Sequence, residues 1–139
     1  MDQSTVSRNA SRCVLIVDAD LPRWLVANSA AVLGVALGAH GYIAHGPDLP
    51  DSSGSMHPGI GVMPLPILAA SASDLPGLRQ KALDARAVVI DFNAAARDSR
   101  TYPEYEDKLA RDVPEYLGIA VHGPAAVVTS LTGNLKSLR

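Results

Sequence analysis

The sequence has little of several residue types, and each shortage excludes a class of protein. With one cysteine, Cys13, among 139 residues, no disulfide can form within the chain, which is usual in a reducing compartment. The 12 Lys and Arg residues are outnumbered by 14 Asp and Glu residues, so the chain lacks the basic excess of a dedicated nucleic-acid binder. We therefore expect a cytoplasmic protein that does not bind nucleic acid.

Long hydrophobic runs are also missing. The most apolar stretch, Leu25 to Ala39, is shorter than the ~20 residues that a membrane-spanning helix needs, and it contains Asn28 and Ser29. The apolar run near the start, CVLIV, is too short for the ~7–15-residue core of a signal peptide. We expect neither a membrane segment nor a signal peptide.

The residues that are present indicate one folded unit. Apolar residues make up 47% and charged residues 19% of the chain, a composition typical of a globular domain. Residues 1–11 are rich in Ser, Asn and Gln without periodicity, and we expect a flexible tail there. No linker or repeat divides the rest, so residues 12–139 are predicted to form a single α/β domain.

Strand-like and helix-like patterns alternate along this domain. Short apolar runs predict strands, and longer stretches with start or end signals predict helices. The strands are expected at 13–17, 66–70, 87–91 and 116–122, and the helices at 22–37, 75–85, 102–112 and 124–131. This alternation predicts a mostly parallel or mixed sheet of about four strands, covered by helices.

The helix expected at 22–37 is apolar nearly all round, which suggests cover on more than one side. Its small residues Ala27, Ala31, Gly34 and Gly38 recur every three or four positions. Glycine within a helix costs ~1 kcal/mol relative to alanine, so these residues indicate a close approach to another element. That element is either the sheet of the same chain or a second copy in a homodimer.

The segment 46–64 has no long regular pattern. It contains the turn-forming strings GP, DSSG and HPG, and at most one short strand fits just before it, around residues 42–45. A connection of this length is either a functional loop or a cover over the core.

Two aspartates, Asp18 and Asp91, each follow an apolar run that is expected to be a strand, and Asp20 lies just beyond the first. Ligands of open α/β sheets bind outside the carboxyl ends of the strands, so neighbouring parallel strands would bring these carboxylates together. Such a pair can share a proton or hold a cation. Alternatively, the aspartates cap turns and helix N-termini.

Histidines supply the next candidate groups. His122 ends an expected strand, where it either bonds the backbone or works with an aspartate on a water or on the hydroxyl of Thr129 or Ser130. His57 lies in the segment 46–64 and is a candidate ligand contact. The four histidines show no metal-ligand spacing, so no metal site is expected.

Two further positions are candidate ligand contacts. Asn28, a polar break in the first helix, either faces the strand end beside Asp18 or bonds a loop carbonyl. Backbone N–H groups at the helix start after Gly123 can hold an anion. The phosphate-binding patterns GxGxxG and GxxxxGK[ST] do not occur, so no cofactor is expected.

Several strings together resemble one family over residues 13–139. They are CVLIVDADLPRWLVANSAAVLG and YLGIAVHGPAAVVTSLTGNLKSLR, with DSSGSMHPGIG, PLPIL and VVIDF between them. The family is an uncharacterised bacterial one, catalogued as the domain of unknown function numbered two thousand. It is similar in fold to peptidyl-tRNA hydrolase II, which implies a three-layer α/β/α sandwich on a small mixed sheet.

The resemblance carries over only part of the hydrolase site. It implies a role for Asp91, at the place of an aspartate of the hydrolase, and it matches Asp20-Leu21 to the DL step after the first strand of that fold and Gly123-Pro124 to the GP step before its last helix. The hydrolase lysine before the first helix has no counterpart, and Ala95 stands where the hydrolase has threonine. Arg23 cannot replace the lysine in proton transfer, because arginine stays protonated.

Two functions therefore stay open. In the preferred one, the chain keeps the hydrolase fold without that activity and acts as a binding or interaction module, with a second copy or an unknown small molecule as partner. This hypothesis predicts that the segment 46–64 covers the strand ends. In the alternative, the chain hydrolyses a small ester or amide, and Asp91 and His122 activate a water.

Overall fold

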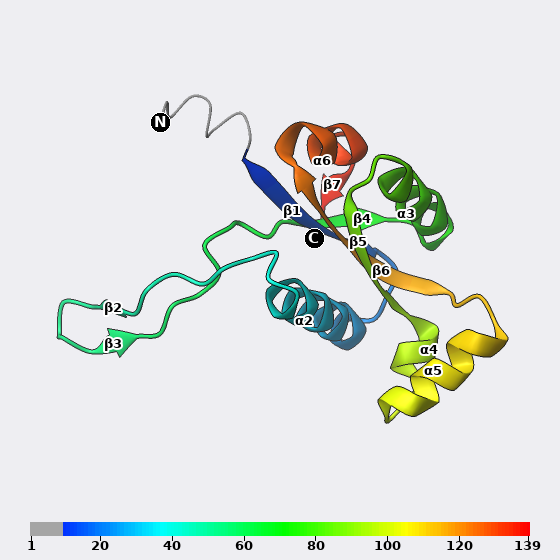
Figure 1. Cartoon of the computed structure of the whole chain (residues 1–139), viewed down its shortest axis with the longest axis horizontal. Helices are drawn as coiled ribbons and strands as arrows, with labels where there is room; N and C mark the ends of the chain where they lie inside the picture. Colours follow the sequence, from blue (N-terminus) through cyan, green and yellow to red (C-terminus); the bar gives the residue numbers. More distant parts are fainter. Residues whose placement is uncertain (1–9) are drawn as a thin grey trace.

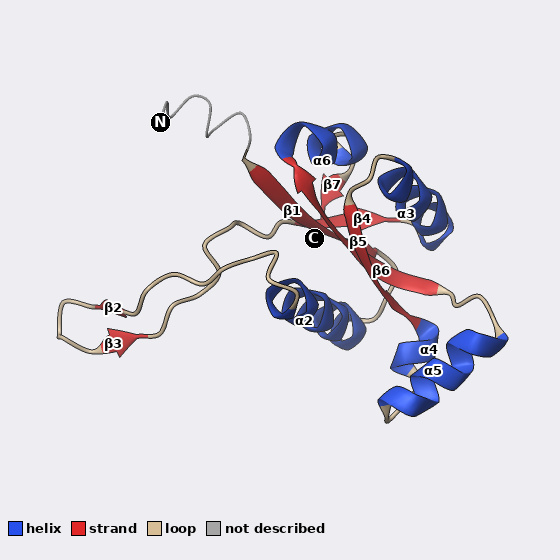
Figure 2. Ribbon diagram, viewed as in Figure 1, coloured by secondary structure: helices blue, strands red, loops and turns tan. Residues whose placement is uncertain are grey.

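A computed structural model describes residues 10–139, in which helices cover both faces of one mixed sheet (Figures 1 and 2). Residues 1–9, most of the predicted tail, lie outside the described residues. The sheet has five strands in the order β5-β6-β1-β4-β7, namely Val88–Asn93, Tyr116–Pro124, Ser11–Asp18, Ile67–Ala70 and Lys136–Ser137. The helices are α2 (Arg23–Ala39), α3 (Leu75–Asp84), α4 (Ala94–Arg97), α5 (Tyr102–Arg111) and α6 (Ala125–Thr132), with a 3₁₀ turn η1 (Ala72–Asp74) before α3.

Strand β1 lies at the centre of the sheet. It pairs parallel with β4 and antiparallel with β6, so Leu15 has Ile67 on one side and Ala120 on the other. The run from Cys13 to Asp18 is buried throughout. A strand covered on both faces needs apolar residues at successive positions, which is the pattern CVLIV. The predicted central strand is confirmed, and Cys13 is a buried small side chain.

The two faces of the sheet carry separate apolar clusters. Helix α2 packs on one face through Leu25, Leu33 and Leu37, with Leu15 and Phe92 from the strands. Helices α3 and α6 pack on the opposite face through side chains that meet the other residues of β1, namely Leu75, Ala82, Val128, Val14 and Ile16. Alternate residues of a strand point to opposite faces, so β1 serves both clusters at once. The expected α/β architecture is confirmed, with five strands in the main sheet instead of four.

The sequence patterns missed several element ends. Strand β5 continues two residues beyond the predicted end at Asp91, and β6 continues through Gly123-Pro124, where a helix start was expected. The short helix α4 and the edge strand β7 were not predicted. Gly133 ends α6, as expected.

The segment between α2 and β4 forms a hairpin that extends away from the sheet (Figure 1). We call residues 44–62 the arm. Its two short strands, β2 (Leu49–Pro50) and β3 (Met56–His57), pair antiparallel, and His45 bridges to Gly61 nearer the base. All of residues 47–58 are exposed. The expectation that this segment covers the strand ends is therefore wrong.

Candidate functional site

The two strand-end aspartates are not neighbours in the sheet. β1 and β5 run in the same direction, but β6 lies between them. Asp18 accepts the backbone N–H of Asp20 through Oδ1 at 2.9 Å, so it fixes the turn after β1. Asp91 lies within β5, opposite Ile119 of β6. The expected convergence of these carboxylates does not occur, because an antiparallel strand separates the two parallel ones.

Asp91 and His122 point to opposite faces of the sheet. His122 pairs with Val88, three residues before Asp91, and side chains alternate along a strand. On the α2 face, the His122 ring lies 5.0 Å from that of Tyr42, and its buried Nδ1 atom has no hydrogen-bond partner among the described residues. Asp91 faces α3 instead. The sheet itself therefore lies between the two groups of the predicted hydrolase pair.

The other predicted contacts are also dispersed. Asn28 is exposed on α2, in the layer opposite the face that Asp18 points to. Gly123 is buried within β6, where a Cβ would lie 3.6 Å from that of Ala87, so it opens no helix and offers no anion site. His57 lies on the arm.

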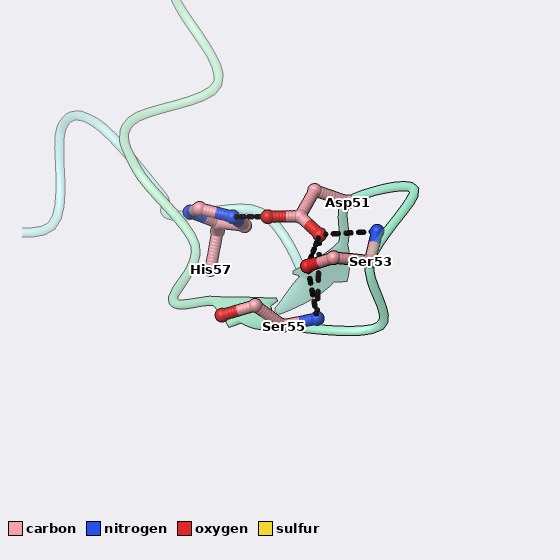
Figure 3. A network of polar contacts seen from close by, with 4 residues as sticks. All are labelled: Asp51, Ser53, Ser55 and His57. Atoms are coloured by element: carbon pink, nitrogen blue, oxygen red, sulfur yellow. Dashed lines mark hydrogen bonds and ion pairs between the residues drawn. The ribbon is translucent and has the colours of Figure 1, made fainter.

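At the tip of the arm, His57 and Asp51 form a local network (Figure 3). His57 Nε2 lies 2.7 Å from Asp51 Oδ2, while Oδ1 accepts the Ser53 hydroxyl at 2.6 Å. The hydrogen bond with His57, followed by those from Ser53, lowers the pKa of Asp51 to about 2. The serine bonds the aspartate and not the histidine, so this network closes the turn and does not activate a nucleophile.

The carboxyl ends of β1 and β4 do lie side by side, as parallel neighbours. An open depression of about 480 Å³ there is lined by Asp20, Ser71, Asp74 and Lys136, among others. Asp18 is turned into the β1 turn and is 7% exposed. Among residues 10–139, no three His, Cys, Asp or Glu side chains gather as a metal site would need.

A second polar group surrounds Asp91, near the end of β5. Asp91 Oδ2 accepts a hydrogen bond from Asn93 Nδ2 at 2.7 Å, and Oδ1 lies 3.7 Å from Arg79 Nε. The Arg79 guanidinium stacks over the Tyr116 ring, 5.3 Å from its centre. Its Nε is buried and donates no hydrogen bond to the described residues. The charge of Asp91 and the ring of Tyr116 thus hold Arg79 beside Asp91. Neither the Arg79 Nε nor the Asp91 Oδ1 has a hydrogen-bond partner among residues 10–139.

Asn93 is the residue that organises this group. It is fully buried, and its Oδ1 caps α4 by accepting the Ala96 N–H at 3.1 Å. Its Nδ2 bonds Asp91 and also lies 3.3 Å from the Tyr105 hydroxyl of α5. A buried amide with several partners fixes the backbone and the carboxylate relative to each other. Asp91 is therefore held in place from within its own strand.

Asp91 opens into a groove of about 490 Å³ along the outer edge of β5. Its floor is formed by residues 89–92, which include side chains from both faces of the sheet. One wall comes from α2, through Val32, Ala36 and His40; the other comes from the α4–α5 region, including Thr101, Tyr102 and Tyr105. The rings of Tyr102 and Tyr105 meet edge to face at 5.5 Å. The groove therefore combines apolar side chains with a carboxylate, the guanidinium of Arg100, hydroxyls and a strand edge.

The outer edge of β5 is flanked by the groove walls but carries neither lysine nor proline. Proteins commonly block such edges with very short strands, lysine or proline. The opposite edge, β7, is two residues long, whereas β5 is six residues long and reads VVIDFN. Within residues 10–139, no strand pairs with the outer side of β5. Its backbone N–H and C=O groups on that side therefore have no strand partner within those residues.

Sequence reasoning identified Asp91 but missed its partners Asn93 and Arg79, and it missed Tyr105, which contacts Asn93. The spacing of Asp91 and Asn93 could have revealed their contact. They are two residues apart, so a strand that continued past Asp91 would place both side chains on one face of the sheet. Arg79 and Tyr105 come from α3 and α5, and no local pattern relates those helices to Asp91.

Comparisons with known proteins identify a family and a fold. The family model described as "Protein of unknown function (DUF2000)" matches residues 11–139. A solved structure of a protein of unknown function from Agrobacterium tumefaciens strain C58 is similar to this one, with a TM-score of 0.82 and 16% identity over 91% of this chain and 96% of that chain. No curated protein matches. At this identity the likeness concerns the fold alone.

Proposed function

The chain belongs to the DUF2000 family of proteins of unknown function, and we propose that it is a binding module that takes up an extended peptide along the edge of β5. The observation that supports this is a groove whose floor is an unpaired strand edge. A peptide that adds a strand to such an edge gains main-chain hydrogen bonds, and pockets beside the edge select its side chains.

The groove suggests which peptides would bind. Side chains of an added strand alternate between the two faces of the sheet. On one face they meet Asp91, whose Oδ1 accepts no hydrogen bond from residues 10–139, so a donor side chain such as Lys or Gln fits there. On the other face they meet Val32, Ala36 and Phe92, which favour an apolar side chain. The proposed ligand therefore alternates donor and apolar residues.

Hydrolysis is the weaker candidate for this site. Asp91 and His122 lie on opposite faces of the sheet, and Ala95 supplies no hydroxyl near Asp91. The resemblance to peptidyl-tRNA hydrolase II stays a prediction, and with it the loss of that activity. We expect the purified protein to leave peptidyl-tRNA intact over times in which a hydrolase would cleave it completely.

Selection from a phage-displayed library of random nine-residue peptides tests the binding proposal. Enriched peptides should alternate donor and apolar residues, and their binding should slow amide hydrogen exchange in β5. Tyr102 is 78% exposed on the groove wall, so Tyr102→Ala should keep the fold and weaken binding roughly tenfold, as loss of an aromatic contact does. Asp91→Asn should shift the selected peptides away from Lys at the facing position.

Val113→Ala is the matched control, since Val113 is 87% exposed and is not among the residues of the groove. It should bind selected peptides as the wild type does. A library that yields no binder, or binders that leave β5 exchange unchanged and tolerate Tyr102→Ala, would overturn the proposal.

A further inference from the structure

The outward face of α2 lacks the polar cover that a surface helix normally has. From Trp24 to Ala39 the helix contains no charged residue. Leu25, Ser29, Leu33 and Leu37 point into the core, while Val35 on the opposite side is 71% exposed. A helix that borders solvent usually carries charged side chains on its outer face. An uncovered apolar face of this kind is typical of an interface.

The arm beside this helix carries four more exposed apolar side chains. They are Leu49, Met56, Ile60 and Val62, with exposed fractions between 57 and 82%. An isolated two-stranded hairpin is marginally stable in water, because it has no third layer to pack against. The arm contains neither lysine nor arginine. Its composition and shape therefore suit a segment that becomes covered.

A cavity joins the arm to α2. It has a volume of about 520 Å³ and lies between Gly34 and Gly38 of the helix and Ile43, Met63 and Leu65 at the base of the arm, among others. The two glycines leave space that larger side chains would fill. One continuous surface thus contains both a projecting arm and an apolar hollow.

A projection and a hollow on the same surface suit a two-fold dimer, because each copy then offers both to the other. Val32 and Val35 of α2 and the four arm residues expose on the order of 700 Å² on each copy, close to the ~800 Å² that each partner contributes to an interface of standard size. Neither α2 after Arg23 nor the arm carries lysine or arginine to match an acidic partner, and the two aspartates of the arm are engaged within it, Asp48 by the Gly59 N–H and Asp51 by His57 and Ser53. These features favour a second copy over an unrelated protein.

We propose that two copies of this chain form a two-fold dimer in which the outer faces of α2 meet and each arm lies across the α2 surface and hollow of the other copy. This contact uses Val35, Ile60 and the hollow at Gly34 and Gly38. It does not use Asp91 or Tyr102, but it borders the β5 groove at Val32, which lies on the α2 wall of that groove.

Analytical ultracentrifugation of the full chain tests the dimer. The wild type should sediment at twice the monomer mass at micromolar concentration. Val35→Asp and Ile60→Asp should each raise the dissociation constant by roughly a hundredfold or more, because symmetry places the unpaired carboxylate in the apolar interface twice. Both residues are exposed in the single chain, so circular dichroism and the melting midpoint of the variants should show an intact fold.

Val113→Asp is the control and should stay dimeric, because Val113 is 87% exposed at a place outside the proposed contact.

In a separate experiment, Val35→Cys should form a disulfide between copies under mild oxidation, since Cys13 is buried and cannot compete. A monomeric wild type, or a dimer that both aspartate variants keep, would overturn the proposal. A dimer that Val35→Asp dissociates and Ile60→Asp preserves would overturn the part assigned to the arm. A dimer weakened by Tyr102→Ala instead would place the contact at the β5 edges.

Discussion

Replacing Asn93 by alanine should destabilise the protein by about 3 kcal/mol. Asn93 is fully buried, and its Oδ1 caps α4 through the Ala96 N–H, a contact worth ~1 kcal/mol. Its Nδ2 bonds the Asp91 carboxylate at 2.7 Å, and a hydrogen bond to a charged group contributes ~1.5–3 kcal/mol. The lower half of that range applies, because Asp91 is 22% exposed and water can replace part of the lost bond.

Urea unfolding measures this loss directly. With a slope of ~1–3 kcal/mol per molar urea for a small protein, about 3 kcal/mol moves the midpoint down by roughly 1–3 M. The groove should change as well, because Asn93 also bonds Asp91 and contacts Tyr105. A variant within about 1 kcal/mol of the wild type would refute the role assigned to Asn93, since it would leave the cap or the charged bond without effect.

Asn93→Asp separates the two contributions. It keeps an oxygen to accept the Ala96 N–H but brings a second carboxylate against Asp91, so it should be unstable at neutral pH. Two adjacent carboxylates hold a shared proton more tightly when folded than when unfolded, so stability should rise as pH falls. Asn93→Ala should show no such recovery. Unfolding curves of the two variants between neutral and mildly acidic pH make the comparison.

Three further outcomes follow from other parts of the molecule. Gly59→Ala should loosen the arm, because the new Cβ would lie 1.8 Å from the Gly46 carbonyl oxygen. Limited proteolysis should then cut the arm faster than in the wild type, while the melting midpoint of the domain stays within a few degrees of the wild-type value. His57→Ala should raise the carboxyl pKa of Asp51 from about 2 toward 3.8, which an NMR titration would measure. In the wild type the hydrogen bonds at the tip of the arm should persist at mildly acidic pH and be lost as the pH falls through the Asp51 pKa of about 2. Burial raises the pKa of the Cys13 thiol, so a thiol reagent should label it in urea and leave the folded protein unlabelled, and rapid labelling of the native state would contradict its place in the core.

The elements of the sheet could be predicted from the sequence because each buried strand and each helix has its own period. β1 reads as an uninterrupted apolar run, and α2 begins one residue after the predicted start at Pro22 and continues two residues beyond the predicted end at Leu37. The order of the strands could not be predicted in the same way. An apolar run such as YLGIAV shows that a strand is buried, but not which strands lie beside it or in which direction they run.

The errors at the candidate site have local physical causes. The apolar run AVVID predicts that a strand ends at Asp91, yet the backbone continues extended through Asn93, whose side-chain oxygen caps α4. The binding-module hypothesis predicts that the segment 46–64 covers the strand ends, whereas its glycines and prolines predict only turns. Those turns are present, and they produce a hairpin that pairs with itself. Turn residues specify local bends but not the direction in which a hairpin points.

The central pairing of the sheet also constrains how the chain can be made. β1 is synthesised well before β6, which is its antiparallel neighbour. Ser11 can therefore pair with Pro124 only after β6 has been made. During translation the nascent chain must hold an apolar strand with one open side until β6 has left the ribosome, and sheets built from such distant partners form slowly. A message that stops before β6 would therefore yield an aggregation-prone product and not a smaller working domain.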